Sequence, residues 1–333
     1  MSVTIALAGN PNCGKTTMFN ALTGANQYVG NWPGVTVEKK EGKLKNQKDV
    51  TVTDLPGIYS LSPYTLEEVV SRDYLLKEKP DVIIDLVDAT NIERNLYLAT
   101  QLLEIGIPVV IALNMVDLLK KNNIHINVKG LSSALGCPIV ETSALKGTGL
   151  KEVVDEAIKC ANQHRVPSKQ MEFPKAVEKA VNEIEGFVPA NIAEENKRWY
   201  AVKLLERDSK VKEGLNLPAS AQSRIEEIAS GLEKAEDDDT ESIVTDGRYQ
   251  YIQKVVSANV KRSGNKMTVS DKIDRIVTNR ILGLPIFILT MFIVYYVSVT
   301  TVGTMVTDWT NDSFVGTIQS VVSDGLGNAG VAD

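Results

Sequence analysis

Residues 9–16 read Gly9-Asn10-Pro11-Asn12-Cys13-Gly14-Lys15-Thr16, and this stretch decides the fold because it matches the pattern G-x-x-x-x-G-K-[ST]. The run Val3–Ala8 before it predicts a strand, and Lys15–Leu22 predicts a helix. In such a strand–loop–helix unit, glycines let backbone N–H groups face phosphates at the helix N-terminus. We expect Lys15 to reach the β- and γ-phosphates, and the hydroxyl of Thr16, next to Thr17, to bind Mg²⁺. Taken alone, the pattern allows an ATPase, a kinase or a chance match.

Residues 1–165 alternate between short apolar runs and helical patterns. The further expected strands are Asp49–Thr53, Val82–Val87, Val109–Leu113 and Ile139–Glu141, and the further expected helices are Glu67–Leu76, Asn95–Ile105 and Leu150–Ala161. Runs that are nearly all apolar are typical of strands covered on both faces. The alternation therefore predicts an α/β domain with a doubly wound sheet.

Three later segments indicate which nucleotide would bind. Asp54-Leu55-Pro56-Gly57 follows a strand, so that Asp54 can hold Mg²⁺ through water and the Gly57 N–H can meet the γ-phosphate. Asn114-Met115-Val116-Asp117 follows another strand, and the Asp117 carboxylate can accept both N1–H and N2–H₂ of guanine. Adenine lacks this pair of donors, so Asp117 selects GTP over ATP.

The third of these segments, Ser143-Ala144-Leu145, follows the last expected strand, where the Ala144 N–H can meet guanine O6. Four segments in this order, each at the carboxyl end of a strand, predict a Ras-like P-loop GTPase that binds GTP, GDP and Mg²⁺. Met115 stands where this class usually has Lys. Its apolar chain can still pack on the base, and we expect modestly weaker nucleotide binding.

The loop between the first two motifs is a candidate switch. It reads Gly30-Asn31-Trp32-Pro33-Gly34-Val35-Thr36-Val37-Glu38. We expect Gly34–Glu38 to border the nucleotide, with Thr36 bound to Mg²⁺ only when the γ-phosphate is present. Trp32 is unusual in a loop rich in Gly and Pro. It is either part of the switch or an anchor in the core.

The remaining chain divides into four expected parts. Residues 168–262 are rich in Glu, Lys and Ala with helical periodicity, and 268–280 predict a cytosolic juxtamembrane helix. Residues 281–307 contain no charge and are long enough to cross a membrane, leaving 308–333 outside; the alternative is a buried core helix. Lys and Arg precede this apolar stretch and none follows it, which places the N-terminal domains in the cytoplasm.

Composition limits the possible partners and cofactors. The net charge of −6 indicates no nucleic-acid partner, because such partners need a basic face. Cys13, Cys137 and Cys160 lie far apart and lack metal-ligand spacing, so reduced thiols in a cytosolic domain are expected.

The motifs quoted above resemble those of the FeoB family, bacterial ferrous iron transporters with a cytosolic G domain. Asp54–Leu61, Asp88–Leu98 and Asn279–Phe287 are also similar to that family. The resemblance implies that the helical middle is a domain like a guanine-nucleotide-dissociation inhibitor. It implies Fe²⁺ as the transported substrate, small cytosolic Feo accessory proteins and a homo-oligomer as possible partners, and the inner membrane as the location. The family has many membrane helices, so this chain looks truncated.

The hydrolytic mechanism needs a group that the sequence does not supply in the usual way. Many GTPases place a Gln directly after Asp-x-x-Gly, but Ile58 follows here. The potassium-activated GTPases that the family resembles have an Asn at the position of Asn12 and use carbonyls of the first switch loop. Here these are the backbone oxygens near Gly30 and Trp32. Glu67 and Glu68 are alternative residues for orienting water.

Two other functions remain open from the sequence. One is a ribosome-assembly type of GTPase with a membrane anchor, although no basic RNA-binding module is evident. The other is a nucleotide sensor in which slow hydrolysis only resets the switch.

Overall fold

The computed structural model describes residues 2–24, 27–45, 47–169, 171–262 and 283–328. They fall into two compact units, one up to Ser263 and one from Gly264 onward. The expected helix over 268–280 and the first two residues of the expected membrane span lie outside the described residues. The two units are treated separately below.

The first unit contains a seven-stranded mixed sheet in the order β2-β3-β4-β1-β5-β6-β8. The five expected strands are confirmed as β1 (Val3–Gly9), β4 (Gln47–Asp54), β5 (Val82–Asp88), β6 (Val109–Asn114) and β8 (Ile139–Glu141), all parallel to one another. Their carboxyl ends therefore share one edge of the sheet, which brings the four motif segments together.

Two strands at the sheet edge were not expected from the sequence. β2 (Gln27–Asn31) pairs antiparallel with β3 (Glu38–Leu44), and β3 pairs antiparallel with β4. β3 reads Glu-Lys-Lys-Glu-Gly-Lys-Leu and has no apolar run. Backbone pairing on both sides, rather than burial, makes this segment a strand.

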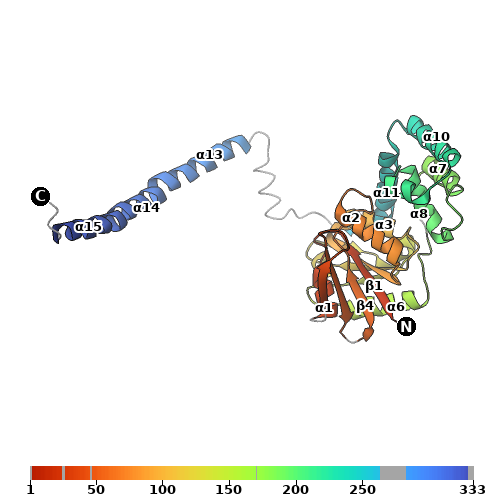
Figure 1. Ribbon diagram of the computed structural model, residues 1–333, viewed down its shortest axis with the longest axis horizontal. Helices are drawn as coiled ribbons and strands as arrows, with labels where there is room; N and C mark the ends of the chain where they lie inside the picture. Colours follow the sequence, from red (N-terminus) through yellow and green to blue (C-terminus); the bar gives the residue numbers. More distant parts are fainter. Residues whose placement is uncertain (1, 25–26, 46, 170, 263–282, 329–333) are drawn as a thin grey trace. The chain divides into compact units, whose positions relative to one another are not determined.

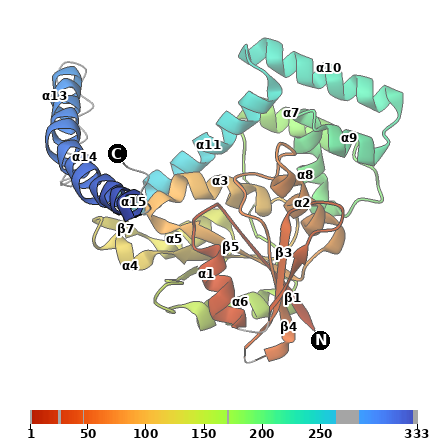
Figure 2. The same ribbon diagram turned by 60° about the vertical axis from the view of Figure 1, so that its left-hand side comes forward.

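Helices cover both faces of the sheet (Figures 1 and 2). α1 (Lys15–Thr23) and α6 (Leu150–Asn162) pack on one face around Phe19 and Val153. The other face carries α2 (Leu66–Asp73), which continues as a π-helical turn over Tyr74–Glu78, and α3 (Ile92–Leu102), which follows a short 3₁₀ turn, Ala89–Asn91. α4 (Val116–Leu119) and α5 (Val128–Leu135) complete this part. The helices expected around residues 15–22, 67–76, 95–105 and 150–161 are confirmed.

The middle of the chain is helical, as expected. It comprises α7 (Lys175–Glu185), α8 (Glu194–Leu205), α9 (Ser209–Leu215), α10 (Ala219–Glu236) and α11 (Thr240–Asn259). α11 ends at Asn259, and the last residues of the expected domain 168–262 form β9 (Val260–Arg262), which pairs antiparallel with β7 (Ile124–Ile126). A two-stranded sheet therefore joins the end of the helical domain to the G domain.

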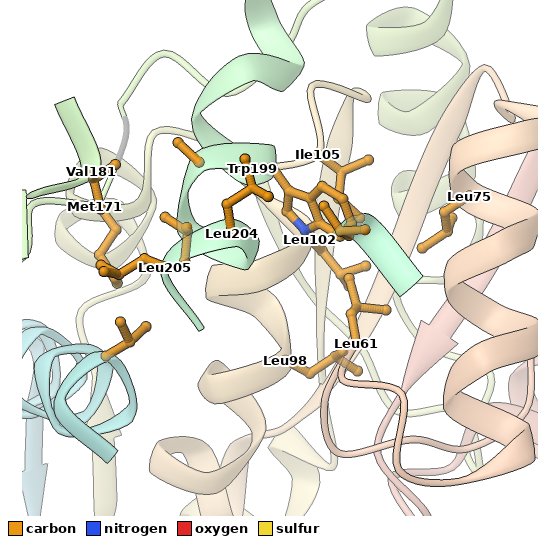
Figure 3. Packing of buried hydrophobic residues seen from close by; sticks show 14 of the residues in the cluster. Leu61, Leu75, Leu98, Leu102, Ile105, Met171, Val181, Trp199, Leu204 and Leu205 are labelled. Carbon is orange, nitrogen blue, oxygen red and sulfur yellow. The ribbon is translucent and has the colours of Figure 1, made fainter. Parts of the chain in front are cut away.

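The two domains of the first unit share one apolar core. Figure 3 shows Trp199 of α8 beside Leu102 and Ile105, at and just after the end of α3, and Leu204, Leu205 and Leu98 belong to the same cluster. Two buried ion pairs cross the same boundary: Arg248 Nη2 lies 2.7 Å from Glu104 Oε2, and Arg72 Nη1 lies 2.7 Å from Asp208 Oδ2. Because burying an unpaired charge is costly, these pairs fix how the domains fit together.

The second unit is a run of helix with exposed apolar side chains. It consists of α13 (Gly283–Tyr296), α14 (Thr304–Trp309) and α15 (Gly316–Asn328), joined by π-helical segments Val297–Gly303 and Thr310–Val315. Among the described residues one stretch, Gly283–Asp324, is long and apolar enough to cross a membrane. This stretch has 42 residues, which is more than the ~20 that one crossing needs. The helix continues past residue 307, where the expected membrane span ends.

Candidate nucleotide-binding site

A cavity of about 690 Å³ opens at the carboxyl ends of β1, β6 and β8. The structure brings together in its wall most of the residues that the sequence singled out: Asn10, Pro11, Asn12, Gly14, Lys15, Thr16, Thr17, Gly57, Asn114, Met115, Asp117, Ser143, Ala144 and Leu145. Leu118, which the sequence did not indicate, lines it as well. One continuous site therefore joins the four motifs.

The phosphate loop follows the end of β1 and has tight backbone geometry. Gly14 has φ +96°, and a Cβ there would lie 2.4 Å from Asn114 Nδ2, so only glycine fits. A Cβ on Gly9 would meet Cys13 Sγ at 2.8 Å. Cys13 itself is buried, and burial raises the pKa of its thiol to about 12. It packs under the loop as a neutral thiol.

Lys15, which lines the cavity, forms an ion pair with Asp54. Lys15 Nζ lies 2.5 Å from Asp54 Oδ1, and both side chains are largely buried. Burial raises the pKa of Asp54, and the neighbouring Lys15 ammonium opposes that rise. Carboxylate and hydroxyl oxygens are ligands that Mg²⁺ prefers, so Asp54 and Thr16 fit the metal.

The rest of the second motif supports the loop. Leu55 is buried in the core, and its N–H donates to Leu7 O. Pro56, the next residue in the motif, is partly buried. A Cβ on Gly57 would lie 3.2 Å from Pro11 Cα, so a larger residue would press on the phosphate loop.

Asn114 connects three segments and has a larger structural role than the sequence suggested. Its Nδ2 donates to Cys13 O at 2.8 Å, and its Oδ1 accepts from the Ala144 N–H at 2.9 Å. The expected contact of the Ala144 N–H with guanine O6 stays a prediction, and in this structure that N–H donates to Asn114 Oδ1.

Asp117 has the electrostatic state that guanine recognition needs. A hydrogen bond from Ser143 lowers the pKa of its carboxyl, and Lys146, whose Nζ lies 3.3 Å from Asp117 Oδ2, acts in the same direction. The carboxylate is thus ionised at neutral pH and can accept two N–H groups. The sequence did not single out Lys146, although it directly follows the last motif. Met115 lines the cavity with φ 63°, a left-handed conformation that is uncommon outside glycine.

The candidate switch does not line this cavity. Thr36 is exposed, as are Gly34 and Glu38, while Val35 and Val37 are partly buried against the core. Trp32 is buried, with its ring centroid 5.2 Å from that of Tyr74 at the end of the α2 region. In the conformation of this structure Trp32 is therefore an anchor in the core.

The backbone oxygens expected to bind K⁺ are engaged elsewhere. Trp32 O accepts from the Val35 N–H at 3.2 Å, and Gly30 pairs with Lys39 in the β2–β3 ladder. Asn12, with φ 65°, does face the nucleotide cavity. The K⁺ and Thr36 assignments remain predictions that require the first switch to rearrange.

Trp32 should report that rearrangement. In a chain with Trp199→Phe and Trp309→Phe, we expect a Mg²⁺-bound GTP analogue to shift Trp32 emission to longer wavelength relative to GDP. Thr36 does not line the cavity, so the loop that carries both Thr36 and the buried Trp32 is expected to move when Thr36 binds Mg²⁺. Steady-state fluorescence measures this shift, and a further Trp32→Phe substitution is the control that should abolish it. Identical spectra in both states, with binding confirmed, would contradict a mobile first switch.

The structure separates the two alternative water-orienting residues. Glu68 is buried and closes a capping box with Thr65 at the start of α2, and it also accepts from Ser60 Oγ at 3.0 Å. These contacts commit Glu68 to holding the helix end. Glu67 is exposed in the first turn of the same helix.

Comparisons with known proteins agree with this geometry. Residues 3–157 match the family model "Ferrous iron transport protein B", and residues 173–261 match "FeoB cytosolic helical domain". A crystal structure of NFeoB from S. thermophilus bound to GDP·AlF4⁻ and K⁺ is 48% identical, with a TM-score of 0.70 over 77% of this chain and 99% of that one. This chain belongs to the FeoB family. Its G domain and helical domain are the two cytosolic parts of that family, and the ribosome-assembly alternative loses its support.

Full-length FeoB relatives extend well beyond this chain. The Fe(2+) transporter FeoB of Shigella flexneri is 39% identical over 310 residues, which are 89% of this chain and 38% of that protein. A fusion of Fe(2+) transport protein A with FeoB from Porphyromonas gingivalis is 39% identical over 336 residues, covering 96% of this chain and 39% of the fusion. The chain thus spans about two fifths of the length of the curated relatives it matches.

Proposed function

We propose that this chain is the GTP-binding and GTP-hydrolysing cytosolic portion of a ferrous iron transporter, together with the start of its membrane part. The observation that carries the proposal is the joint placement of Lys15, Asn114 and Asp117 in one cavity of a FeoB-type G domain. Fe²⁺ is the transported substrate, and the GTP/GDP cycle regulates or drives its uptake.

The residues at the cavity have different roles in binding and hydrolysing GTP. Asp117 selects guanine, and Lys15 neutralises charge on the β- and γ-phosphates. Thr16 and Asp54 would hold Mg²⁺, together with Thr36 when the switch closes, and the ion would supply further charge neutralisation at the phosphates. The Asn12 amide oxygen would hold K⁺, which would supply the positive charge that an arginine finger provides in other GTPases. The Gly57 N–H then meets the γ-phosphate.

Location and partners follow from the same assignment. The apolar helix Gly283–Asp324 fits an anchor in the bacterial inner membrane, with the two folded domains in the cytoplasm. The fusion of a Fe(2+) transport protein A with FeoB in P. gingivalis supports a small Feo accessory protein as a partner. A homo-oligomer stays a prediction.

The helical domain restrains the nucleotide cycle through α2. Arg72 of α2 is buried against Asp208, and the Tyr64 hydroxyl before α2 donates to Glu241 of α11. Because α2 follows the motif that contains Gly57, fixing α2 opposes movement of the segment beside the γ-phosphate. This is the role expected of a domain that slows GDP dissociation.

The substitution Asp208→Asn tests that role. Asp208 also caps α9 by accepting from the Val211 N–H, and Asn can keep this cap while the charge opposite Arg72 is lost. We expect the free energy of unfolding to fall by about 3 kcal/mol and GDP release to accelerate about fivefold or more. Stopped-flow release of a fluorescent GDP and denaturant unfolding measure the two effects.

The matched control is Glu227→Gln, which breaks the exposed pair Arg224–Glu227 on α10. We expect that variant to match the wild type in both assays, since exposed pairs contribute little. If Asp208→Asn releases GDP at the wild-type rate although its stability has fallen, the helical domain is a spacer and not an inhibitor.

A further inference from the structure

The segment that directly follows Gly57 is held by an arginine outside the four motifs. Tyr59 is 42% exposed, yet the guanidinium carbon of Arg94 lies 4.4 Å from the centroid of its ring. This is within the range in which the positive charge of Arg is attracted to the face of an aromatic ring. Tyr59 lies two residues after Gly57, so its position bears directly on the segment next to the γ-phosphate.

Arg94 is also connected to the phosphate loop. It lies in the first turn of α3, and its carbonyl accepts from Asn10 Nδ2 at 3.4 Å. Asn10 is buried in the wall of the nucleotide cavity. The Ile58 N–H completes the connection by donating to Gly9 O at 3.3 Å. The start of α3 thereby contacts Asn10 of the phosphate loop and Tyr59 of the segment that follows Gly57.

The charges around Arg94 leave its guanidinium available to Tyr59. Within the described part of the chain, Arg94 forms no ion pair, and the adjacent Glu93 is paired instead with Arg262 at 2.8 Å. Arg262 of β9 therefore pairs with the carboxylate at this helix end, and Arg94 contacts the aromatic ring.

We propose that Arg94 is a positioning residue for GTP hydrolysis. Its contact with Tyr59 fixes the backbone of Gly57–Tyr59. The Gly57 N–H is then held toward the γ-phosphate, and the attacking water enters a site whose backbone is already in place. The inference rests on the proposed GTPase function. It explains how a G domain with Ile58 in place of the usual Gln keeps this segment ordered without a side chain that touches the water.

The variants Arg94→Ala and Tyr59→Leu test the contact, alone and combined. Removing an exposed cation–π contact is expected to lower kcat about two- to fivefold. KM for GTP and the Kd for GDP should change less than twofold, because neither side chain lines the cavity. Arg94→Lys keeps a cation and should recover part of the loss. The double variant should be no slower than the slower single variant.

Arg262→Ala is the matched control, because it removes an exposed arginine from the neighbouring pair with Glu93 and should keep the wild-type kcat. Steady-state hydrolysis in KCl and Mg²⁺ gives kcat and KM, and circular dichroism confirms folding. A wild-type kcat in Arg94→Ala, or strictly additive losses in the double variant, would overturn the inference while the wild type still hydrolyses GTP. Failure of the wild type to hydrolyse GTP would instead overturn the proposed function.

Discussion

Replacing NaCl with KCl at constant ionic strength is expected to raise GTP hydrolysis by this chain strongly, toward the ~10³-fold that an arginine finger supplies in other GTPases. The reason is that K⁺ has a radius suited to amide and backbone oxygens and would supply positive charge beside the phosphates, whereas Na⁺ is smaller. Phosphate release in matched salts measures the effect. Equal rates in the two salts would remove K⁺ from the mechanism.

Two substitutions at Asn12 separate the amide from the backbone. Asn12 has φ 65°, so Asn12→Ala removes the amide and also adds strain, while Asn12→Gly removes the amide and tolerates this conformation. We expect both variants to lose the response to K⁺ and to keep much of the affinity for GDP, since Lys15 and the loop amides remain. A K⁺ response that survives in Asn12→Gly would return attention to Glu67 as the residue that acts on water.

The second large effect concerns the choice of base. Asp117→Asn is expected to weaken GTP binding about 10²-fold or more, because two hydrogen bonds to a charged acceptor are lost, and to favour xanthine nucleotides, whose C2 oxygen suits an amide donor. Titration with fluorescent guanine and xanthine nucleotides measures the exchange.

Lys146→Gln is the matched control for this exchange. It removes the ion-pair partner of Asp117 from a side chain that is 60% exposed, and we expect only a small change in affinity. Equal affinity of the wild type for ATP and GTP would contradict the role of Asp117.

The sequence was sufficient where local pattern and structure coincide. β1, β5 and β6 have apolar runs that a doubly covered sheet buries, and motifs follow the strands directly, so most of the cavity wall could be predicted. β3 could not, because its residues are mostly charged and its pairing partners are β2 and β4. Trp32 also depended on tertiary structure, since its neighbour Tyr74 lies far along the chain.

The partners of individual polar and charged groups could not be predicted from the sequence. The Ala144 N–H was assigned to guanine from its place in the motif, but Asn114 Oδ1 accepts it in this structure. The pairs Arg72–Asp208 and Arg248–Glu104 join residues more than 130 positions apart, and no local pattern indicates such partners. The contact of Arg94 with Tyr59 escaped prediction for the same reason.

Single-turnover phosphate release from GTP and from ATP, with the purified chain in detergent, Mg²⁺ and KCl, tests the central claim most directly. We predict that the chain releases phosphate from GTP well above the rate without protein and leaves ATP intact. Equal release from both nucleotides, or no release from GTP once binding has been confirmed, would contradict the account.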